Sequence, residues 1–320
     1  MRLIQKIRLG ISGCLLGEPV RFDGGHRLDR FITDTLGQYV EFVPVCPEAE
    51  CGLGVPREAM RLVGDPEAPR LMTVRTKVDL TDRMVTWARK RVEELEQEDL
   101  RGFIFKSKSP SSGMERVKVY NEAVQGAPVT RGVGMFARIF MEHFPLLPVE
   151  EEGRLHDPVL RENFIERLFV LQRWRELLAA RPHLGDLVAF HTRHKLLILA
   201  HSPDHYRELG RLVARAQEIP AQELYEHYQS RLMAGLRLKT TPKKNTNVLQ
   251  HLMGYFKKDL TPDEKQELLE VIDNYHQGYV PLVVPATLIN HYARKYHQPY
   301  LKEQFYLHPH PVELQLRNHV

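Results

Sequence analysis

The sequence predicts an α/β N-terminal domain with a mostly parallel sheet, followed by an all-α C-terminal domain. In the first part, strand-like runs at 7–14, 39–46 and 102–106 alternate with amphipathic segments at 27–39 and 81–98. Beyond about residue 150, strand patterns nearly vanish and segments with helical spacing or caps follow one another. Alternation of strands and helices, followed by helices alone, is typical of two domains of these classes.

The individual elements follow from local patterns. The run IRLGISGC at 7–14 is a buried strand that leads into a glycine-containing turn, and YVEFVPVC at 39–46 is rich in aromatic and β-branched residues. Apolar spacing predicts a helix over 27–39, and a Thr/Asp cap precedes the helix over 81–98. In the second part, helices are expected at 158–180, 183–201, 203–217, 220–236, 245–258, 261–277 and 285–297.

A chain of 320 residues is long enough for two cores. We expect the α/β domain over 1–148, an acidic linker over 149–160 and the helical domain over 161–320. The last stretch, 305–320, is expected to form an extended tail that docks on the helices.

The composition is that of a globular protein, with 42% hydrophobic and 27% charged residues and a net charge of +4. It excludes a disordered or fibrous chain. The sequence has no run of eighteen apolar residues, and its first ten residues, MRLIQKIRLG, lack the apolar core of a secretory signal. We therefore expect a cytoplasmic protein without a membrane partner.

Unusual residues follow the three predicted strands of the first domain. Cys14 ends the first strand, Cys46 ends the second, and the loop KSKSPSSG at 106–113 follows the third. Ligands of parallel sheets collect outside the carboxyl ends of the strands. The pattern therefore predicts a site where these three segments meet.

The three cysteines favour metal binding or catalysis over a disulfide framework, because the chain shows no export signal. The alternative is that they are buried small apolar residues. Cys46 and Cys51 have a spacing found among iron-sulfur ligands. Zinc is the competing metal, and His26 could then complete a set of four ligands.

Five local motifs carry a family resemblance: SGCLLG at 12–17, VRFDGG at 20–25, VCPE at 45–48, GLGVPRE at 52–58 and KSKSPSSGMERVKVY at 106–120. Together they resemble the bacterial thiouracil desulfidase family over most of residues 5–145. The resemblance implies a 4Fe-4S cluster on three cysteines, with a free iron that captures the sulfur of a thiolated pyrimidine while water supplies the replacing oxygen.

The family's first two cluster ligands correspond to Cys14 and Cys46, whereas its third cysteine is replaced by Ser112. We expect Cys51 to complete the set, with Ser112 lining the pocket; the alternative is a weakened or lost cluster. The resemblance also implies Glu48 as general acid/base and Ser109 as its orienting group. A structural alternative pairs Glu48 with Arg21 or Arg57.

Three cations near these motifs, Arg57, Lys106 and Lys108, could contact a substrate phosphate. The alternative is that each is an ordinary solvated charge.

The second half resembles a widespread bacterial domain family of unknown function over about 185–318, through strings such as FHTRHKLLILAH at 190–201 and QFYLHPHPVELQLRN at 304–318. Within it, residues 231–258 contain seven Lys or Arg and no Asp or Glu. Basic groups interleaved with aromatics suit RNA. The predicted RNA-binding residues are Arg193, Lys195, Lys239, Lys243, Lys244, Tyr255, Lys257 and Lys258.

Histidines in the same half, His191, His194, His201 and His205, lack a metal-binding motif and are expected to be structural or to face RNA.

Together these features predict a hydrolytic, iron-sulfur-dependent desulfidase of a thiolated base in tRNA, such as 4-thiouridine, with the helical domain holding the RNA. Two alternatives stay open. One is a noncatalytic RNA-binding protein with a degenerate cluster site, and the other is a desulfidase of free thiouracil.

Overall fold

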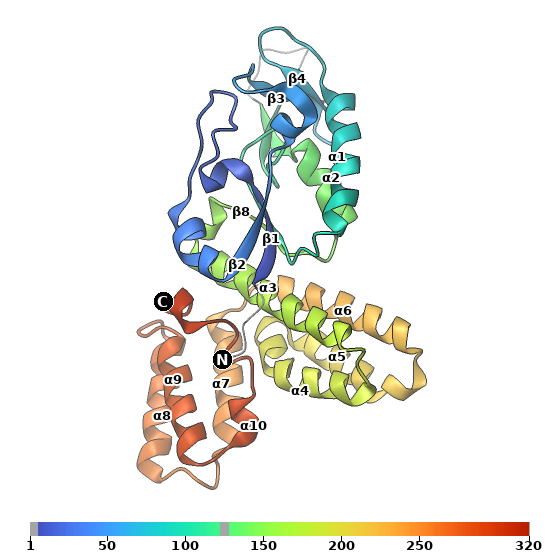
Figure 1. Cartoon of the computed structure of the whole chain (residues 1–320). Helices are drawn as coiled ribbons and strands as arrows, with labels where there is room; N and C mark the ends of the chain where they lie inside the picture. Colours follow the sequence, from blue (N-terminus) through green and yellow to red (C-terminus); the bar gives the residue numbers. More distant parts are fainter. Residues whose placement is uncertain (1–5, 122–127, 320) are drawn as a thin grey trace. The chain divides into compact units, whose positions relative to one another are not determined.

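The computed structural model describes residues 6–121 and 128–319 (Figure 1). The chain divides into two compact units, Met1–Asp157 and Pro158–Val320. Residues 1–5 lie outside the described residues. The expectation that the chain has no secretory signal partly depends on them.

The first unit contains a four-stranded parallel sheet with the order β2-β1-β5-β8. Its strands are β1 (Ile7–Ser12), β2 (Val40–Val45), β5 (Phe103–Phe105) and β8 (Val149–Glu151). All three strand pairs are parallel. The prediction of a mostly parallel sheet is confirmed for this sheet. Its fourth strand, β8, comes from the segment expected to be a linker.

Two helices, α1 (Thr81–Glu96) and α2 (Met135–His143), pack together and share a core with this sheet (Figure 1). Aromatic side chains fill that core, and the rings of Phe103 and Phe140 lie 4.8 Å apart. Gly10 allows the close packing, because a Cβ there would lie 2.3 Å from the Phe103 ring. The apolar runs seen in the sequence thus become one continuous core.

A second, mixed sheet was not predicted from the sequence. Its order is β4-β3-β6-β7, with β3 (Met60–Asp65), β4 (Ala68–Thr73), β6 (Val117–Tyr120) and β7 (Val129–Gly132). The β3–β4 and β6–β7 pairs are antiparallel, whereas β3 and β6 run parallel. Leu62 and Leu71 of this sheet pack against Met84 of α1. The helix α1 therefore contributes to both cores of the unit.

The helix expected over 27–39 is shorter and irregular. A π-helical turn spans Phe31–Thr35 and a 3-10 turn spans Leu36–Gln38. The start is fixed by Asp29, whose carboxylate accepts a hydrogen bond from the backbone nitrogen of Ile32 at 3.1 Å.

The second unit is helical, as predicted. Its α-helices are α3 (Pro158–Ala179), α4 (Leu184–His201), α5 (Pro203–Ala214), α6 (Ala221–Arg237), α7 (Pro242–Gly254), α8 (Pro262–His276), α9 (Val283–Lys295) and α10 (Pro299–Lys302). Sequence caps determine several starts: the hydroxyl of Thr261 accepts from the nitrogen of Glu264, whose carboxylate accepts from Thr261 in return. Across the described ranges 6–121 and 128–319, every helix is too short or too polar to cross a membrane.

Candidate active site

Segments that follow the parallel strands meet at one edge of the sheet, as the sequence predicts. The Ser12 hydroxyl at the end of β1 accepts a hydrogen bond from the backbone nitrogen of Lys106, which follows β5, at 2.9 Å. Glu152, which follows β8, accepts from the backbone nitrogen of Ser107 at 2.7 Å. Ser12, Lys106 and Ser107 line a cavity of about 400 Å³.

Two of the three cysteines line this cavity, Cys14 and Cys46. Cys14 lies in a 3-10 turn directly after β1 and is 9% exposed. The Cys46 sulfur lies 3.7 Å from the carbonyl of Val20 and 3.7 Å from the Glu48 carboxylate. Burial raises the pKa of Cys14 to about 11 and that of Cys46 to about 12, with the nearby carboxylate of Glu48 adding to both. Both thiols are therefore protonated at neutral pH until a metal displaces the proton.

The carboxylate of Glu48 lines the same cavity within a network of hydroxyls and one guanidinium. Its Oε1 accepts from the hydroxyl of Ser111 at 2.5 Å and from that of Ser109 at 3.4 Å. Its Oε2 lies 3.6 Å from Arg57. The predicted neighbour Ser109 and the predicted pairing with Arg57 therefore occur together. Ser111 was missed, because the four serines of the 106–113 loop look equivalent until the fold selects between them.

Cys51 and Ser112 occupy different places. The hydroxyl-bearing Ser112 is among the residues that line the cavity, whereas the described lining includes neither Cys51 nor His26. The Cys51 thiol donates to the backbone carbonyl of Glu48 at 3.4 Å and packs beside the core of the second sheet. His26 is exposed, and its Nδ1 accepts from the backbone nitrogen of Leu28 at 3.3 Å.

Positive side chains surround the cavity. Lys106 forms an ion pair with Glu152, and Arg21 lies 3.4 Å from Asp23. Within the described part of the chain, Arg27 and Lys108 line the cavity without an ion pair to a carboxylate. They are the cations most available to an anionic group of a substrate.

Two family models match the chain, one for each unit. The model described as 2-thiouracil desulfurase matches residues 9–152, and the model described as a protein of unknown function, DUF1722, matches residues 195–311. The uncharacterized protein YbgA of Escherichia coli (strain K12) is 35% identical over 158 residues, which are 49% of this chain and 94% of that protein. The chain belongs to the DUF1722 family and carries a 2-thiouracil desulfurase domain.

A solved structure of the 4Fe-4S-dependent thiouracil desulfidase TudS is also similar. It is 27% identical to this chain, and the match covers 48% of this chain and 95% of that one, with a TM-score of 0.40.

Some of the predicted RNA-binding residues of the second unit form contacts within the protein, and others are exposed. The Lys244 ammonium donates to the backbone carbonyls of His201 and Lys239 at 2.7 and 2.9 Å. Arg193 forms an ion pair with Glu303 at 3.2 Å. The structure thus uses both of these side chains for internal contacts.

Tyr255 stacks on Tyr300 with ring centroids 4.9 Å apart, and the Lys195 ammonium lies 5.2 Å from the same Tyr300 ring. The face of Tyr255 that contacts Tyr300 is therefore already covered.

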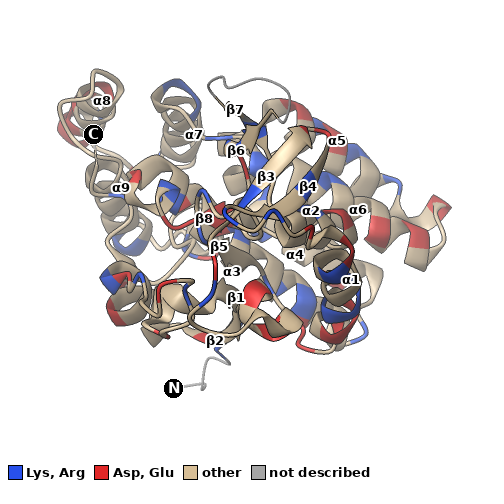
Figure 2. Cartoon of the chain, turned by 90° about the horizontal axis from the view of Figure 1, so that it is seen from above, with Lys and Arg blue, Asp and Glu red and all other residues tan. Residues whose placement is uncertain are grey.

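The remaining predicted cations, Lys239, Lys243, Lys257 and Lys258, are exposed. The helix α7 carries Lys243 and Lys244 and no acidic residue, and it is coloured only blue and tan in Figure 2. Lys243 borders a groove between α7 and α8 that is also lined by Asn247 and Gln250. These exposed groups could contact a polyanion.

Three histidines of the second unit, His191, His194 and His201, are buried in its core. His191 lies 3.0 Å from the hydroxyl of Tyr228, and His194 accepts from the Arg173 guanidinium at 3.2 Å. Burial lowers the pKa of His191 to about 4, and the positive charge of Lys195 adds to this. His201 is also fully buried. These three side chains are therefore packed inside the second unit.

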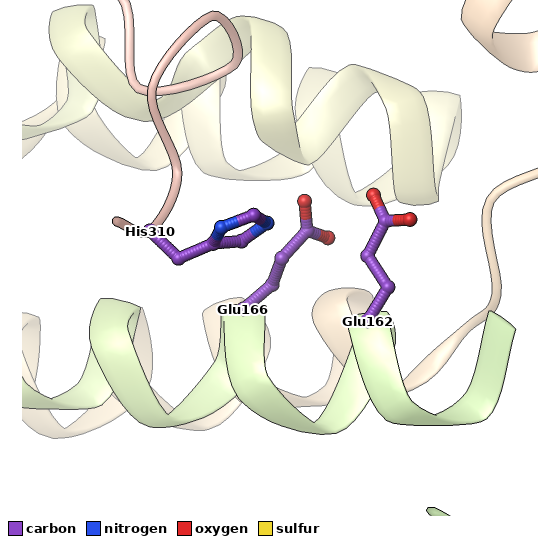
Figure 3. Close-up of side chains that lie close together, drawn as sticks. All are labelled: Glu162, Glu166 and His310. Atoms are coloured by element: carbon purple, nitrogen blue, oxygen red, sulfur yellow. The ribbon is translucent and has the colours of Figure 1, made fainter. Parts of the chain in front are cut away.

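A buried polar cluster, missed from the sequence, joins α3 to the C-terminal tail (Figure 3). Glu162, Glu166 and His310 place their polar atoms within 4.8 Å of one another. The Arg317 guanidinium lies 3.1 Å from the Glu162 carboxylate and 2.7 Å from that of Glu166. His201 approaches Glu166 at 3.0 Å. Because the chain itself supplies the Arg317 guanidinium to both carboxylates, we interpret the cluster as the contact that docks the tail.

Proposed function

We propose that this chain is an iron-sulfur-dependent desulfidase that converts a thiolated pyrimidine to its oxygen analogue, with 4-thiouridine in tRNA as the substrate. One observation carries the proposal: two cysteines and a glutamate, Cys14, Cys46 and Glu48, line one cavity at the carboxyl edge of the parallel sheet. The match to the 2-thiouracil desulfurase family and the similarity to a 4Fe-4S-dependent desulfidase support this chemistry.

The donor groups of the cavity fit a cluster. Thiolates are the usual ligands of a 4Fe-4S cluster, and the cavity offers Cys14 and Cys46 together with hydroxyl oxygens. Cys14 and Cys46 would hold the cluster, with Cys51 or Ser112 as the third ligand. When bound, the cluster supplies an iron with an open position that accepts the sulfur of the substrate.

Residues of the chain itself accept the proton of the attacking water and hold the accepting carboxylate in place. Glu48 accepts a proton from the water that attacks the carbon bearing sulfur. Ser109 and Ser111 hold the carboxylate of Glu48 through its Oε1. The carbon–sulfur bond breaks, a carbon–oxygen bond replaces it, and sulfide leaves. The reaction is hydrolytic, and no electron is gained or lost.

A nucleic-acid substrate suits the charges around the cavity and on the second unit. Arg27 and Lys108 can contact phosphate beside the reacting base. The exposed lysines Lys239, Lys243, Lys257 and Lys258 of the DUF1722 domain can contact the RNA backbone. A base inside folded RNA must leave its stack to enter a cavity of this kind.

The test uses the full chain, reconstituted with iron and sulfide without oxygen, and tRNA that contains 4-thiouridine. We expect the absorbance of the thio-base to disappear and sulfide to accumulate in equal amount. A Glu48→Gln variant with the same iron content should lose activity by at least about 100-fold. Unchanged 4-thiouridine in the presence of an intact cluster would refute the function. Equal turnover of free thiouracil and tRNA would refute only the choice of substrate.

The second candidate function is a noncatalytic RNA-binding protein, and the serine at position 112 favours it. It requires that the cavity hold no working cluster. Iron and sulfide analysis separates the two functions, since a colourless, iron-free protein after anaerobic reconstitution is compatible only with the binding protein.

A further inference from the structure

We propose that Ser112, and not Cys51, provides the third protein ligand of the cluster, through its hydroxyl oxygen. This inference rests on the proposed function, because it concerns how the chain holds the cluster that the function requires. It departs from the expectation that Cys51 replaces the missing cysteine.

The first reason is where the three donors come from. Cys46 follows β2, Cys14 follows β1 and Ser112 lies in the loop after β5, and these strands are neighbours in the order β2-β1-β5. All three residues line the cavity. Donors on three separate strand ends can surround a cluster.

The second reason is the position of the Cys51 thiol. It donates to the Glu48 carbonyl at 3.4 Å and packs beside the core that contains Leu71 and Met84. The π-helical turn Ala49–Leu53 sets this direction. A half-buried thiol in such surroundings behaves as a small apolar side chain.

The third reason is that the backbone at Cys51 is held in place. The Arg83 guanidinium donates from Nε to the carbonyl of Cys51 and from a terminal nitrogen to that of Gly52, both at 2.7 Å. Gly52 has a φ of 86°, in the left-handed region. On the other side of the turn, Glu50 accepts from the nitrogen of Cys46 at 2.7 Å and pairs with Arg91 at 3.1 Å. These contacts hold the backbone of the turn that carries Cys51 in its present position.

The Ser112 loop, in contrast, places Ser112 among the residues that line the cavity and is itself well ordered by hydrogen bonds. The nitrogen of Ser112 donates to the hydroxyl of Ser109 at 3.2 Å. The next residue, Gly113, donates to the Ser109 carbonyl and accepts from the nitrogen of Gly134, both at 2.8 Å. Ser112 itself is 3% exposed. Ser112 therefore reaches the cavity from a loop whose backbone is already ordered.

Binding of iron by this oxygen forms one iron–oxygen bond and releases the hydroxyl proton, with no change of oxidation state. The Ser111 hydroxyl lies 3.4 Å from that of Ser112 and already donates to Glu48, so it can pass the proton onward. Because oxygen is a harder ligand than a thiolate, the cluster should be held less tightly than by three cysteines.

The experiment compares the full-length wild type with Ser112→Ala, Ser112→Cys and Cys51→Ala after anaerobic reconstitution. Iron and acid-labile sulfide per chain, the rate of iron loss to a chelator, and the electron paramagnetic resonance spectrum of the reduced cluster are measured. A Cys14→Ala protein serves as the control that loses a thiolate ligand. Thermal unfolding of each iron-free protein checks that the substitutions leave the fold intact.

We expect about four iron atoms per chain in the wild type and in Cys51→Ala, with identical spectra. Ser112→Ala should lose iron at least tenfold faster, and Ser112→Cys should lose it more slowly than the wild type and show an altered spectrum. Iron loss confined to Cys51→Ala, or an unchanged spectrum in Ser112→Cys, would overturn the assignment while leaving the desulfidase function intact. A wild type that binds no iron would overturn both.

Discussion

The hydroxyl of Ser111 lies 2.5 Å from the carboxylate of Glu48, across 63 residues of sequence. Ser111 is fully buried, and its own Oγ is 3.0 Å from that of Ser109. The glutamate therefore meets a fixed pair of hydroxyls on one oxygen, while Arg57 approaches the other oxygen. This arrangement orients the carboxylate toward the cavity.

Replacing Ser111 by Ala should slow the proposed desulfidation. A hydrogen bond to a charged group contributes about 1.5 to 3 kcal/mol, so its loss should lower kcat by about 10- to 100-fold. Ser111→Thr keeps a hydroxyl and should recover part of the rate. The measurement is kcat with tRNA at equal iron content. A kcat equal to that of the wild type would remove Ser111 from the positioning of Glu48.

The thiols Cys14 and Cys46 should resist alkylation in the iron-free protein. At pH 8, fewer than about one thiol in a hundred is ionised when the pKa is about 11 or 12, against about one in four at an ordinary pKa near 8.5. Because the thiolate is the reacting form, alkylation should be more than about tenfold slower than in urea-unfolded chain. Mass spectrometry of the labelled peptides gives both rates. Similar rates in folded and unfolded protein would contradict the burial of these thiols.

Removal of the Arg317 guanidinium should strongly destabilise the second unit. Arg317→Ala leaves the carboxylates of Glu162 and Glu166 buried without their shared cation, which should cost about 3 to 5 kcal/mol in the free energy of unfolding. The control is Arg294→Ala, an exposed position on α9, where a change within about 0.5 kcal/mol is expected. Urea unfolding followed by circular dichroism measures both, and equal effects would mean that the tail is docked by other contacts.

The same cluster should make stability depend on pH. Burial, together with the charge of Glu166, raises the pKa of Glu162 above its ordinary value, against the opposing effect of Arg317. The folded state then binds the Glu162 proton more tightly than the unfolded state does. The stabilisation that this proton provides is therefore lost as pH rises from the ordinary pKa of a glutamate through the raised pKa.

Glu162→Gln cannot titrate, and the pH dependence of its unfolding free energy should be flatter than that of the wild type between about pH 5 and pH 8. His319 lies 3.8 Å from Glu162, so a His319→Gln control is needed to show that the dependence belongs to the glutamate. If the unfolding free energy of Glu162→Gln changed with pH as steeply as that of the wild type, the raised pKa of Glu162 would be contradicted.

The exposed lysines of the DUF1722 domain should contribute to tRNA affinity through phosphate contacts. Replacing Lys243, Lys257 and Lys258 together by Gln should weaken binding and reduce the slope of log affinity against log salt by about 2 to 3. Lys265→Gln, an exposed lysine on α8, is the matched control and should leave the slope unchanged. An unchanged slope in the triple variant would place the RNA elsewhere. Lys244 is left intact because it binds backbone carbonyls.

Local patterns in the sequence were sufficient to predict the helices of the second unit except the short α10, and three strands of the parallel sheet. Their periodicity and caps act within a few residues, as in the reciprocal cap between Thr261 and Glu264. The convergence of Cys14, Cys46 and the 106–113 loop was also predictable, because parallel strands end at one edge. The mixed sheet was not, since its short strands pair through contacts that no local pattern specifies.

The sequence by itself determined which residue types are available for chemistry: two cysteines at strand ends, a glutamate two residues after one of them, and a serine-rich loop. Only the tertiary structure decided which of them face one another. Ser111 meets Glu48, the Cys51 thiol points to a backbone carbonyl, and Arg317 reaches Glu162 across 155 residues. These relationships depend on how distant segments pack, because side-chain direction is set by the backbone turn and the neighbouring core and not by residue type.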